Sequence, residues 1–283
     1  MKETALIILL FSSISCFSQV NKINSERIKE LQLQSITGSS IYIKNGYLNI
    51  EDGGNTFMEL YNNEGKLTEQ YFANLNGKNK TNLKFYYSKC DFYDKSEEIT
   101  KNNGKNKVVK TVKVIYDDLC RESKIISINE NNKIVEIEEL NYNNENRKVS
   151  CISKNLKNEI TSKIIFSYPE KSAVEEKAYF ENDKFWYHYK IKKDENGNEI
   201  ESVSFDETGK ILNIETTKYQ YNSGKVIEEL HFTEDNVLKY KKEYLYNSDN
   251  LIERITTTSK EFGIDMPNLT ENVQIEIYYY TKK

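Results

Sequence analysis

Short runs of alternating apolar and polar residues, each ended by a polar turn, fill most of this 283-residue chain. Successive side chains of a strand point to opposite faces, so this alternation predicts strands with one packed and one solvated face. A tyrosine precedes a turn about every 26 residues, at Tyr61, Tyr87, Tyr116, Tyr142, Tyr168, Tyr221 and Tyr246. The longer step from Tyr168 to Tyr221 covers two periods, with an unmarked position near Asp194.

Turn residues follow most of these tyrosines: Asn-Asn-Glu-Gly at 62–65, Asn-Ser-Gly at 222–224 and Asn-Ser-Asp-Asn at 247–250. Tight turns require positive φ, which Gly adopts freely and Asn tolerates better than most residues. A second set of turns lies between the first, at 130–133, 155–159, 181–184, 207–210 and 234–236. The repeated unit is therefore one strand and one turn, about 13 residues long.

This pattern predicts an all-β fold of tandem antiparallel β-hairpin repeats that form one elongated meander or coiled sheet. An open, a coiled and a closed sheet all agree with it. We expect a signal peptide at 1–18, an N-terminal segment at 19–56, a hairpin repeat domain at 57–258, and a loop with a closing strand at 259–283. The N-terminal segment holds a short helix capped by Ser25 or a strand from Leu31, followed by the first hairpin.

Composition agrees with strands, because the chain has 21 Tyr and 12 Phe but only 2 Pro. Its 40 basic and 44 acidic residues are interspersed, with no basic stripe. Nucleic-acid binding needs a concentrated positive surface, so this class of partner is not expected. The mixed Lys and Glu are best explained as solvated strand faces.

The N-terminus predicts export. Lys2 precedes an apolar run at 5–11 and then small residues, the order of a secretory signal, and the run is too short to span a bilayer. Cleavage before Gln19 gives a soluble exported protein. Lipid modification of Cys16 is the alternative, and only then is a membrane expected as a partner. Both forms place the protein in the periplasm, at the outer membrane or outside the cell.

The chemistry expected from the sequence is sparse. After cleavage Cys90, Cys120 and Cys151 remain; with an odd number and no C-x-x-C, neither a disulfide framework nor a zinc site is expected, and the thiols are interpreted as small packed side chains. No nucleophile elbow, zinc-protease or phosphate-loop motif occurs. Adjacent carboxylates such as Glu228 and Glu229 point to opposite strand faces. We therefore expect no catalytic residue, cofactor or metal.

Two segments merit separate interpretation. Residues 194–199 resemble a calcium loop, but the sixth and twelfth positions, counted from Asp194, hold Glu199 and Phe205, so a hairpin turn is the better interpretation. The densest aromatic run is 185–189. Alternation places Trp186 and His188 on one face, and Phe185, Tyr187 and Tyr189 on the other. Trp186, Tyr187, His188 and Tyr189 are candidate ligand-binding residues, with core packing as the alternative.

The phrases Tyr-Asn-x-x-Gly-Lys-Leu at 61–67, Tyr-Asn-Ser-Gly-Lys-Val at 221–226 and Tyr-Asp-Asp at 116–118 resemble the YD repeats of RHS-type bacterial surface proteins. The resemblance covers 57–258. It implies hairpins wound into a long sheet, sometimes a closed shell, and roles in surface recognition or toxin delivery. The chain departs from that family where Asn replaces Asp after Tyr, and it has no evident autoproteolytic core motif or separate toxin domain.

These observations predict a non-catalytic secreted or envelope-attached protein that acts as a binding or structural module at the cell surface. Its partner is an unidentified surface protein or glycan. A carbohydrate-binding protein that uses exposed aromatics is one alternative. An immunity-like protein that neutralises a toxin is another.

Overall fold

The computed structural model describes residues 25–44, 47–48, 55–74, 80–88, 90–102, 105–169, 174–260 and 271–282. The predicted signal peptide at 1–18, the lipidation candidate Cys16 and residues 261–270 of the predicted C-terminal loop lie outside these residues. No helix within the described ranges is long and apolar enough to cross a membrane.

Within those ranges the chain forms one short helix, α2 (Ser25–Glu30), and nineteen strands. The strands are β1 (Leu33–Lys44), β2 (Tyr47–Leu48), β3 (Asn55–Tyr61), β4 (Leu67–Asn74), β5 (Lys80–Tyr86), β6 (Lys95–Asn102), β7 (Lys105–Tyr116), β8 (Glu122–Asn129), β9 (Ile134–Tyr142), β10 (Lys148–Lys154), β11 (Ile160–Ser167), β12 (Val174–Glu181), β13 (Lys184–Lys193), β14 (Glu199–Phe205), β15 (Ile211–Asn222), β16 (Lys225–Phe232), β17 (Leu238–Tyr246), β18 (Ile252–Lys260) and β19 (Glu271–Lys282). The predicted all-β class and the hairpin repeats are confirmed.

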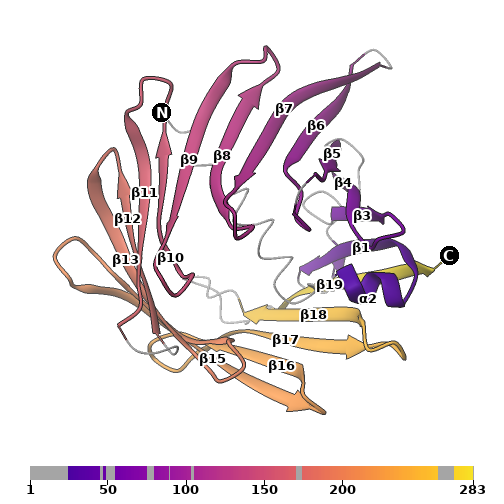
Figure 1. Cartoon of the computed structure of the whole chain (residues 1–283). Helices are drawn as coiled ribbons and strands as arrows, with labels where there is room; N and C mark the ends of the chain where they lie inside the picture. Colours follow the sequence, from indigo (N-terminus) through magenta and orange to yellow (C-terminus); the bar gives the residue numbers. More distant parts are fainter. Residues whose placement is uncertain are drawn as a thin grey trace.

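The sheet is a closed ring (Figure 1). From β3 to β19 each strand pairs antiparallel with the next, and β1 pairs with both β3 and β19. β1 and β3–β19 thus make a barrel of eighteen strands, with β2 paired to the end of β1. Strands lie about 4.8 Å apart, so eighteen of them need a circumference of roughly 86 Å or more. A closed ring is more specific than the predicted meander or coiled sheet, and it forms because β1 pairs with both strands, β3 and β19, whose edges an open sheet would expose.

The predicted turns are confirmed, and most share one geometry. In nine turns the first residue donates its N–H to the carbonyl of the fifth, and the fourth has positive φ; the first residues are Asn62, Asp117, Asn129, Asn143, Asn155, Asp194, Asp206, Thr233 and Asn247. In the eight turns that begin with Asn or Asp, the Oδ1 atom accepts the N–H groups of the third and fifth residues. Asp194 thus begins a hairpin turn, as predicted.

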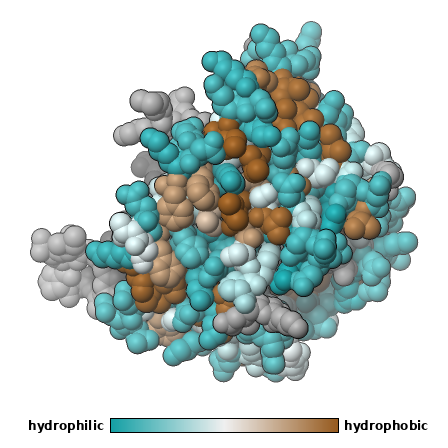
Figure 2. All heavy atoms as spheres, turned by 60° about the vertical axis from the view of Figure 1, so that its left-hand side comes forward, coloured by the Kyte–Doolittle hydropathy of each residue, from teal (hydrophilic) through white to brown (hydrophobic). Residues whose placement is uncertain are grey.

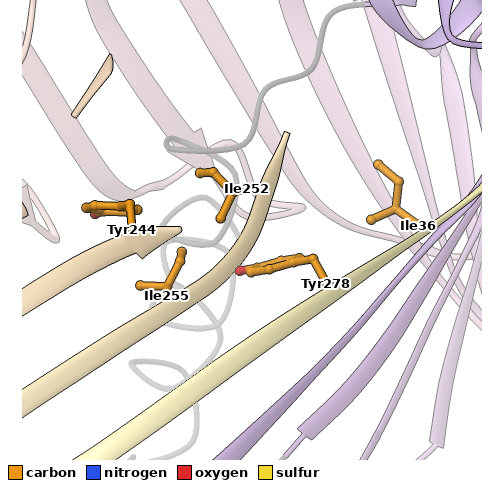
Figure 3. Packing of buried hydrophobic residues seen from close by; sticks show 5 residues of the cluster. All are labelled: Ile36, Tyr244, Ile252, Ile255 and Tyr278. Atoms are coloured by element: carbon orange, nitrogen blue, oxygen red, sulfur yellow. The ribbon is translucent and has the colours of Figure 1, made fainter. Parts of the chain in front are cut away.

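The inner face of the sheet carries the packed core. Ile36, Tyr244, Ile252, Ile255 and Tyr278 form a cluster of buried side chains. Figure 3 shows them on the side of β17 to β19 that faces the other strands of the ring. We call this side of the sheet the inner face and the opposite side the outer face.

The outer face is polar and carries many ion pairs. Lys124 and Glu139 are paired across β8 and β9, and Lys241 Nζ lies 2.8 Å from Glu228 and 3.0 Å from Glu243. Figure 2 brings β11 to β13 forward and shows brown apolar residues in patches broken by teal polar ones. Apolar residues such as Ile115, Ile165 and Leu245 are exposed between these charged pairs.

A disulfide joins two neighbouring connections at one end of the ring. Cys90, between β5 and β6, is bonded to Cys120, in the turn between β7 and β8, and their Cα atoms are 5.9 Å apart. The expectation of packed thiols was wrong for this pair. The bond depends on the antiparallel order, which places every second connection at the same end, and that order leaves no short cysteine motif in the sequence. Cys151 is a free thiol.

Candidate functional site

The periodic tyrosines are mostly structural. The hydroxyl of Tyr87 donates to the carbonyl of Leu67 at 2.8 Å, and Tyr246 donates to Val226 in the same way, also at 2.8 Å. Each acceptor lies near the start of the strand that follows the previous turn at this end of the ring. Burial raises the pKa of Tyr87 to about 12, so the hydroxyl keeps its proton and remains a donor. Such tyrosines connect one hairpin to the next.

A basic residue that ends several of these turns supports the same connection. Arg121 lies 4.6 Å from the ring centroid of Tyr142, and Arg147 lies 4.4 Å from that of Tyr168. Lys225 takes the same place over Tyr246 at 5.1 Å. These are cation–π distances. The recurring order of tyrosine, turn and basic residue is thus explained by packing between hairpins and requires no ligand.

A different group of aromatic residues gathers on the inner face of β12 and β13. The rings of Tyr179 and Tyr187 stack at 4.4 Å, and Tyr189 stands edge-on to Tyr187 at 5.2 Å. The ring of Trp186 lies 4.5 Å from Tyr187, and 59% of this tryptophan is exposed. We call Tyr179, Trp186, Tyr187 and Tyr189 the aromatic cluster.

Direct strand pairs place this cluster on the same face as the core. The pairs run from β13 to β17 as Tyr189–Ser204, Ser202–Glu215, Thr217–His231 and His231–Tyr240, and Tyr244 follows Tyr240 at an even spacing. The inner face therefore presents both a packed core and the three tyrosines of the aromatic cluster, which Trp186 contacts through Tyr187.

A bulge in β13 changes the faces predicted for residues 185–189. Phe180 pairs with Phe185, whereas the adjacent Tyr179 pairs with Tyr187, so strict alternation ends at Trp186. Phe185 therefore lies opposite Phe180 and not beside Tyr187, and the prediction was wrong for it. From Tyr187 onward alternation holds. His188 is on the outer face, where it stacks on Phe205 at 5.2 Å.

The hydroxyl groups distinguish the cluster from most of the periodic tyrosines, with Tyr142 as an exception. Tyr179, Tyr187 and Tyr189 form no side-chain hydrogen bond through their hydroxyls within the described ranges, and all three residues are half-buried. Burial raises the pKa of Tyr179 to about 12, so this hydroxyl also keeps its proton. Three hydroxyls on one part of the inner face can therefore bind water or a ligand.

Charged side chains lie beside the cluster. Glu175 is 2.8 Å from Lys193 and 3.4 Å from Lys177, and Lys177 pairs directly with Tyr189. Burial acts to raise the pKa of Glu175, but the two lysines hold it below its usual value, so the carboxylate is ionised. Glu199 pairs with Lys193 from the other side. The site therefore contains both hydrogen-bond acceptors and hydrogen-bond donors.

A second polar group on the inner face surrounds His231. Its Nε2 lies 2.7 Å from Glu229 and its Nδ1 3.1 Å from the hydroxyl of Thr217, while its ring stacks on Tyr240 at 3.9 Å. Tyr244 donates to the other oxygen of Glu229. Glu229 is only 7% exposed, so we interpret this group as part of the packed core. The opposite faces predicted for Glu228 and Glu229 are confirmed, since Glu228 pairs with Lys241 on the outer face.

The free thiol of Cys151 and the acidic residues form no reactive or metal-binding arrangement within the described residues. The Sγ atom of Cys151 lies 3.6 Å from Glu138, and burial raises the pKa of its thiol to about 12. This thiol is therefore not a nucleophile at neutral pH. Across the described ranges, no three His, Cys, Asp or Glu side chains come close enough to hold a metal ion. The ligand roles predicted for Trp186, Tyr187, His188 and Tyr189 remain predictions.

Comparisons with known proteins do not assign this chain to a family. No family model matches the chain, and no curated protein matches it. Similar solved structures include a porin-like protein from Bacteroides uniformis, with 9% identity over 89% of this chain and 97% of that one and a TM-score of 0.47. A DUF1329 family protein from Desulfovibrio piger has 9% identity over 90% and 88% of the two chains and a TM-score of 0.23.

The Pseudomonas aeruginosa MucA/MucB complex also matches, with 9% identity over 90% of this chain and 92% of that one and a TM-score of 0.16. Because all three TM-scores are below 0.5, these likenesses carry no argument about function. The resemblance to YD repeats stays a prediction.

Proposed function

We propose that the protein is an exported, non-catalytic binding module whose ligand lies on the inner face of the barrel, against the aromatic cluster. The observation that carries this proposal is the contrast between two sets of tyrosines. The hydroxyls of Tyr87, Tyr168 and Tyr246 bind backbone carbonyls, whereas those of Tyr179, Tyr187 and Tyr189 have no such partner. Most tyrosines that connect hairpins resemble the first set, although Tyr142, which packs against Arg121, does not.

Two observations support the exported setting. The disulfide between Cys90 and Cys120 belongs to an oxidising compartment, because cytosolic thiols are kept reduced. The apolar N-terminal run followed by small residues is typical of a secretory signal. The mass of the mature N-terminus tests this part. Cleavage before Gln19 or acylation of Cys16 supports export, and a chain that still begins at Met1 contradicts it.

The binding role is tested by affinity capture from native cell envelopes. The full mature chain and a Tyr187→Ala, Tyr189→Ala variant are immobilised, and the retained proteins, glycans and lipids are identified by mass spectrometry. We expect a molecule that the wild type retains and the variant loses. Tyr279→Ala is the matched control, since Tyr279 is 61% exposed and lies away from the cluster on β19. Equal capture by all three proteins contradicts the proposal and favours a structural module.

A further inference from the structure

We infer that the ligand of the aromatic cluster is an uncharged glycan; this inference rests on the proposed function. The first argument is ring geometry. Tyr179, Tyr187 and Tyr189 have centroids 4.4 to 6.0 Å apart, and Trp186 adds a ring that is more than half exposed. Aromatic rings offer a large, rigid, electron-rich surface. The C–H groups on one face of a pyranose ring fit such a surface.

The second argument is the supply of hydrogen bonds. A sugar hydroxyl both donates and accepts, so its site must offer groups of both kinds. The carboxylate of Glu175 accepts, the ammonium groups of Lys177 and Lys193 donate, and the tyrosine hydroxyls do either. The side chains of Glu175, Lys177 and Lys193 are 16%, 27% and 36% exposed, so the charged groups are held near the rings yet remain reachable. An apolar ligand would shield these charged groups from water without offering them a hydrogen bond, at a cost in binding.

The third argument is charge. Lys177 and Lys193 face Glu175 and Glu199, two cations against two anions. Burial raises the pKa of Glu199, and Glu215 adds to this effect, while Lys177 and Lys193 act to lower it. Glu215 is in turn 2.6 Å from Lys239, so the charges remain balanced. A site with balanced charges gives no net attraction to an acidic or a basic ligand. An uncharged oligosaccharide is therefore favoured over acidic polymers.

The test uses the full mature chain and matched oligosaccharides. Chitohexaose, cellohexaose and maltohexaose are the neutral probes, the deacetylated chitosan hexamer is the cationic probe, and hexagalacturonate is the anionic one. Binding is followed by Trp186 fluorescence and by calorimetry. We expect at least one neutral probe to shift the emission of Trp186, the only tryptophan. We expect charged probes to bind at least about tenfold more weakly, a difference of about 1.4 kcal/mol.

Three variants test whether glycan binding depends on the aromatic cluster. Tyr187→Ala should weaken binding about tenfold by removing a stacking ring, and Tyr187→Phe about threefold by removing only the hydroxyl. Tyr279→Ala should bind like the wild type. A charged probe that binds best overturns the uncharged class. Binding that Tyr187→Ala leaves unchanged overturns both the class and the site.

If no glycan binds, the envelope capture separates the two proposals. A protein or lipid that the wild type retains and the Tyr187→Ala, Tyr189→Ala variant loses contradicts the glycan class but keeps the binding module. Capture of nothing specific by the wild type contradicts both.

Discussion

At the residue scale, the same amino acid serves two purposes in this chain. Tyr246 uses its hydroxyl to hold the carbonyl of Val226, while Tyr187 keeps its hydroxyl unbound. Both follow the alternating pattern, and both are partly buried, so sequence alone does not separate them. What separates them is whether a backbone carbonyl of the neighbouring hairpin lies within reach, and that depends on the register between strands.

This difference predicts that the same substitution affects stability at one position and not at the other. Tyr246→Phe should lower the free energy of unfolding by about 1 kcal/mol, because it leaves a carbonyl without its donor. Tyr187→Phe should leave stability within about 0.5 kcal/mol of wild type. Urea unfolding followed by fluorescence measures both. A stability loss of the same size in Tyr187→Phe would show that its hydroxyl has a structural partner, and so would count against the proposed site.

The carboxyl of Glu229 predicts a dependence of stability on pH. Burial acts to raise its pKa, but His231, Lys242 and Tyr244 together hold it below the usual value. A carboxyl whose pKa is lower in the folded chain adds stability above pH about 4.5, which is lost as the pH falls through the folded pKa. Glu229→Gln should therefore lower the free energy of unfolding by about 2 kcal/mol at pH 7 and by less at pH 4.

Glu276→Gln is the matched control for Glu229. Glu276 also lies on the inner face and accepts a hydrogen bond from Tyr278, but burial raises its pKa. A raised folded pKa means that ionisation of this group opposes folding, so stability is gained below pH about 4.5 and lost as the pH rises. Glu276→Gln should be neutral or stabilising at pH 7. The same sign for both variants in unfolding measurements at pH 4 and pH 7 would contradict this assignment.

At the element scale, hairpins are what the sequence predicts well. Alternation marks the strands, and Asn, Asp or Gly marks the turns, including the one at Asp194, because both signals are local. The bulge at Trp186 was not predictable in this way, since one extra residue leaves the alternating pattern readable while it moves Phe185 to another partner. The disulfide was missed for a similar reason. Its two cysteines lie in separate connections between strands, and only the side-by-side order of the hairpins brings them together.

The disulfide predicts how much this end of the ring depends on a crosslink. It closes a loop with a sequence separation of 30 residues, which corresponds to about 3–4 kcal/mol in the chain-entropy description. Cys90→Ser with Cys120→Ser should therefore lower Tm by about 10 °C. Cys151→Ser, which removes only the free thiol, should change Tm by about 2 °C or less. Calorimetry compares them, and equal Tm values for all three proteins would contradict a stabilising role.

At the scale of the whole molecule, closure of the ring depends on a strand that no local pattern connects to its partners. β1 pairs with β3 nearby in sequence and with β19 at the far end of the chain. Gly38 lies between Phe57 on β3 and Tyr278 on β19, whose rings meet edge to face at 5.8 Å. The repeat period predicts which strands are neighbours within the series of hairpins. It contains no information on which strand closes the ring.

Gly38 gives a direct test of this closure. A Cβ atom at this position would lie 2.0 Å from Cε1 of Phe57, so Gly38→Ala must displace that ring and should cost about 1–3 kcal/mol. Phe57→Ala alone should also destabilise, because it removes a ring packed against the core cluster. Combined, the two substitutions should cost less than the sum of their separate effects, since the clash needs both side chains. Additive costs in urea unfolding would mean that Gly38 is not needed to seat Phe57 at the closing strand.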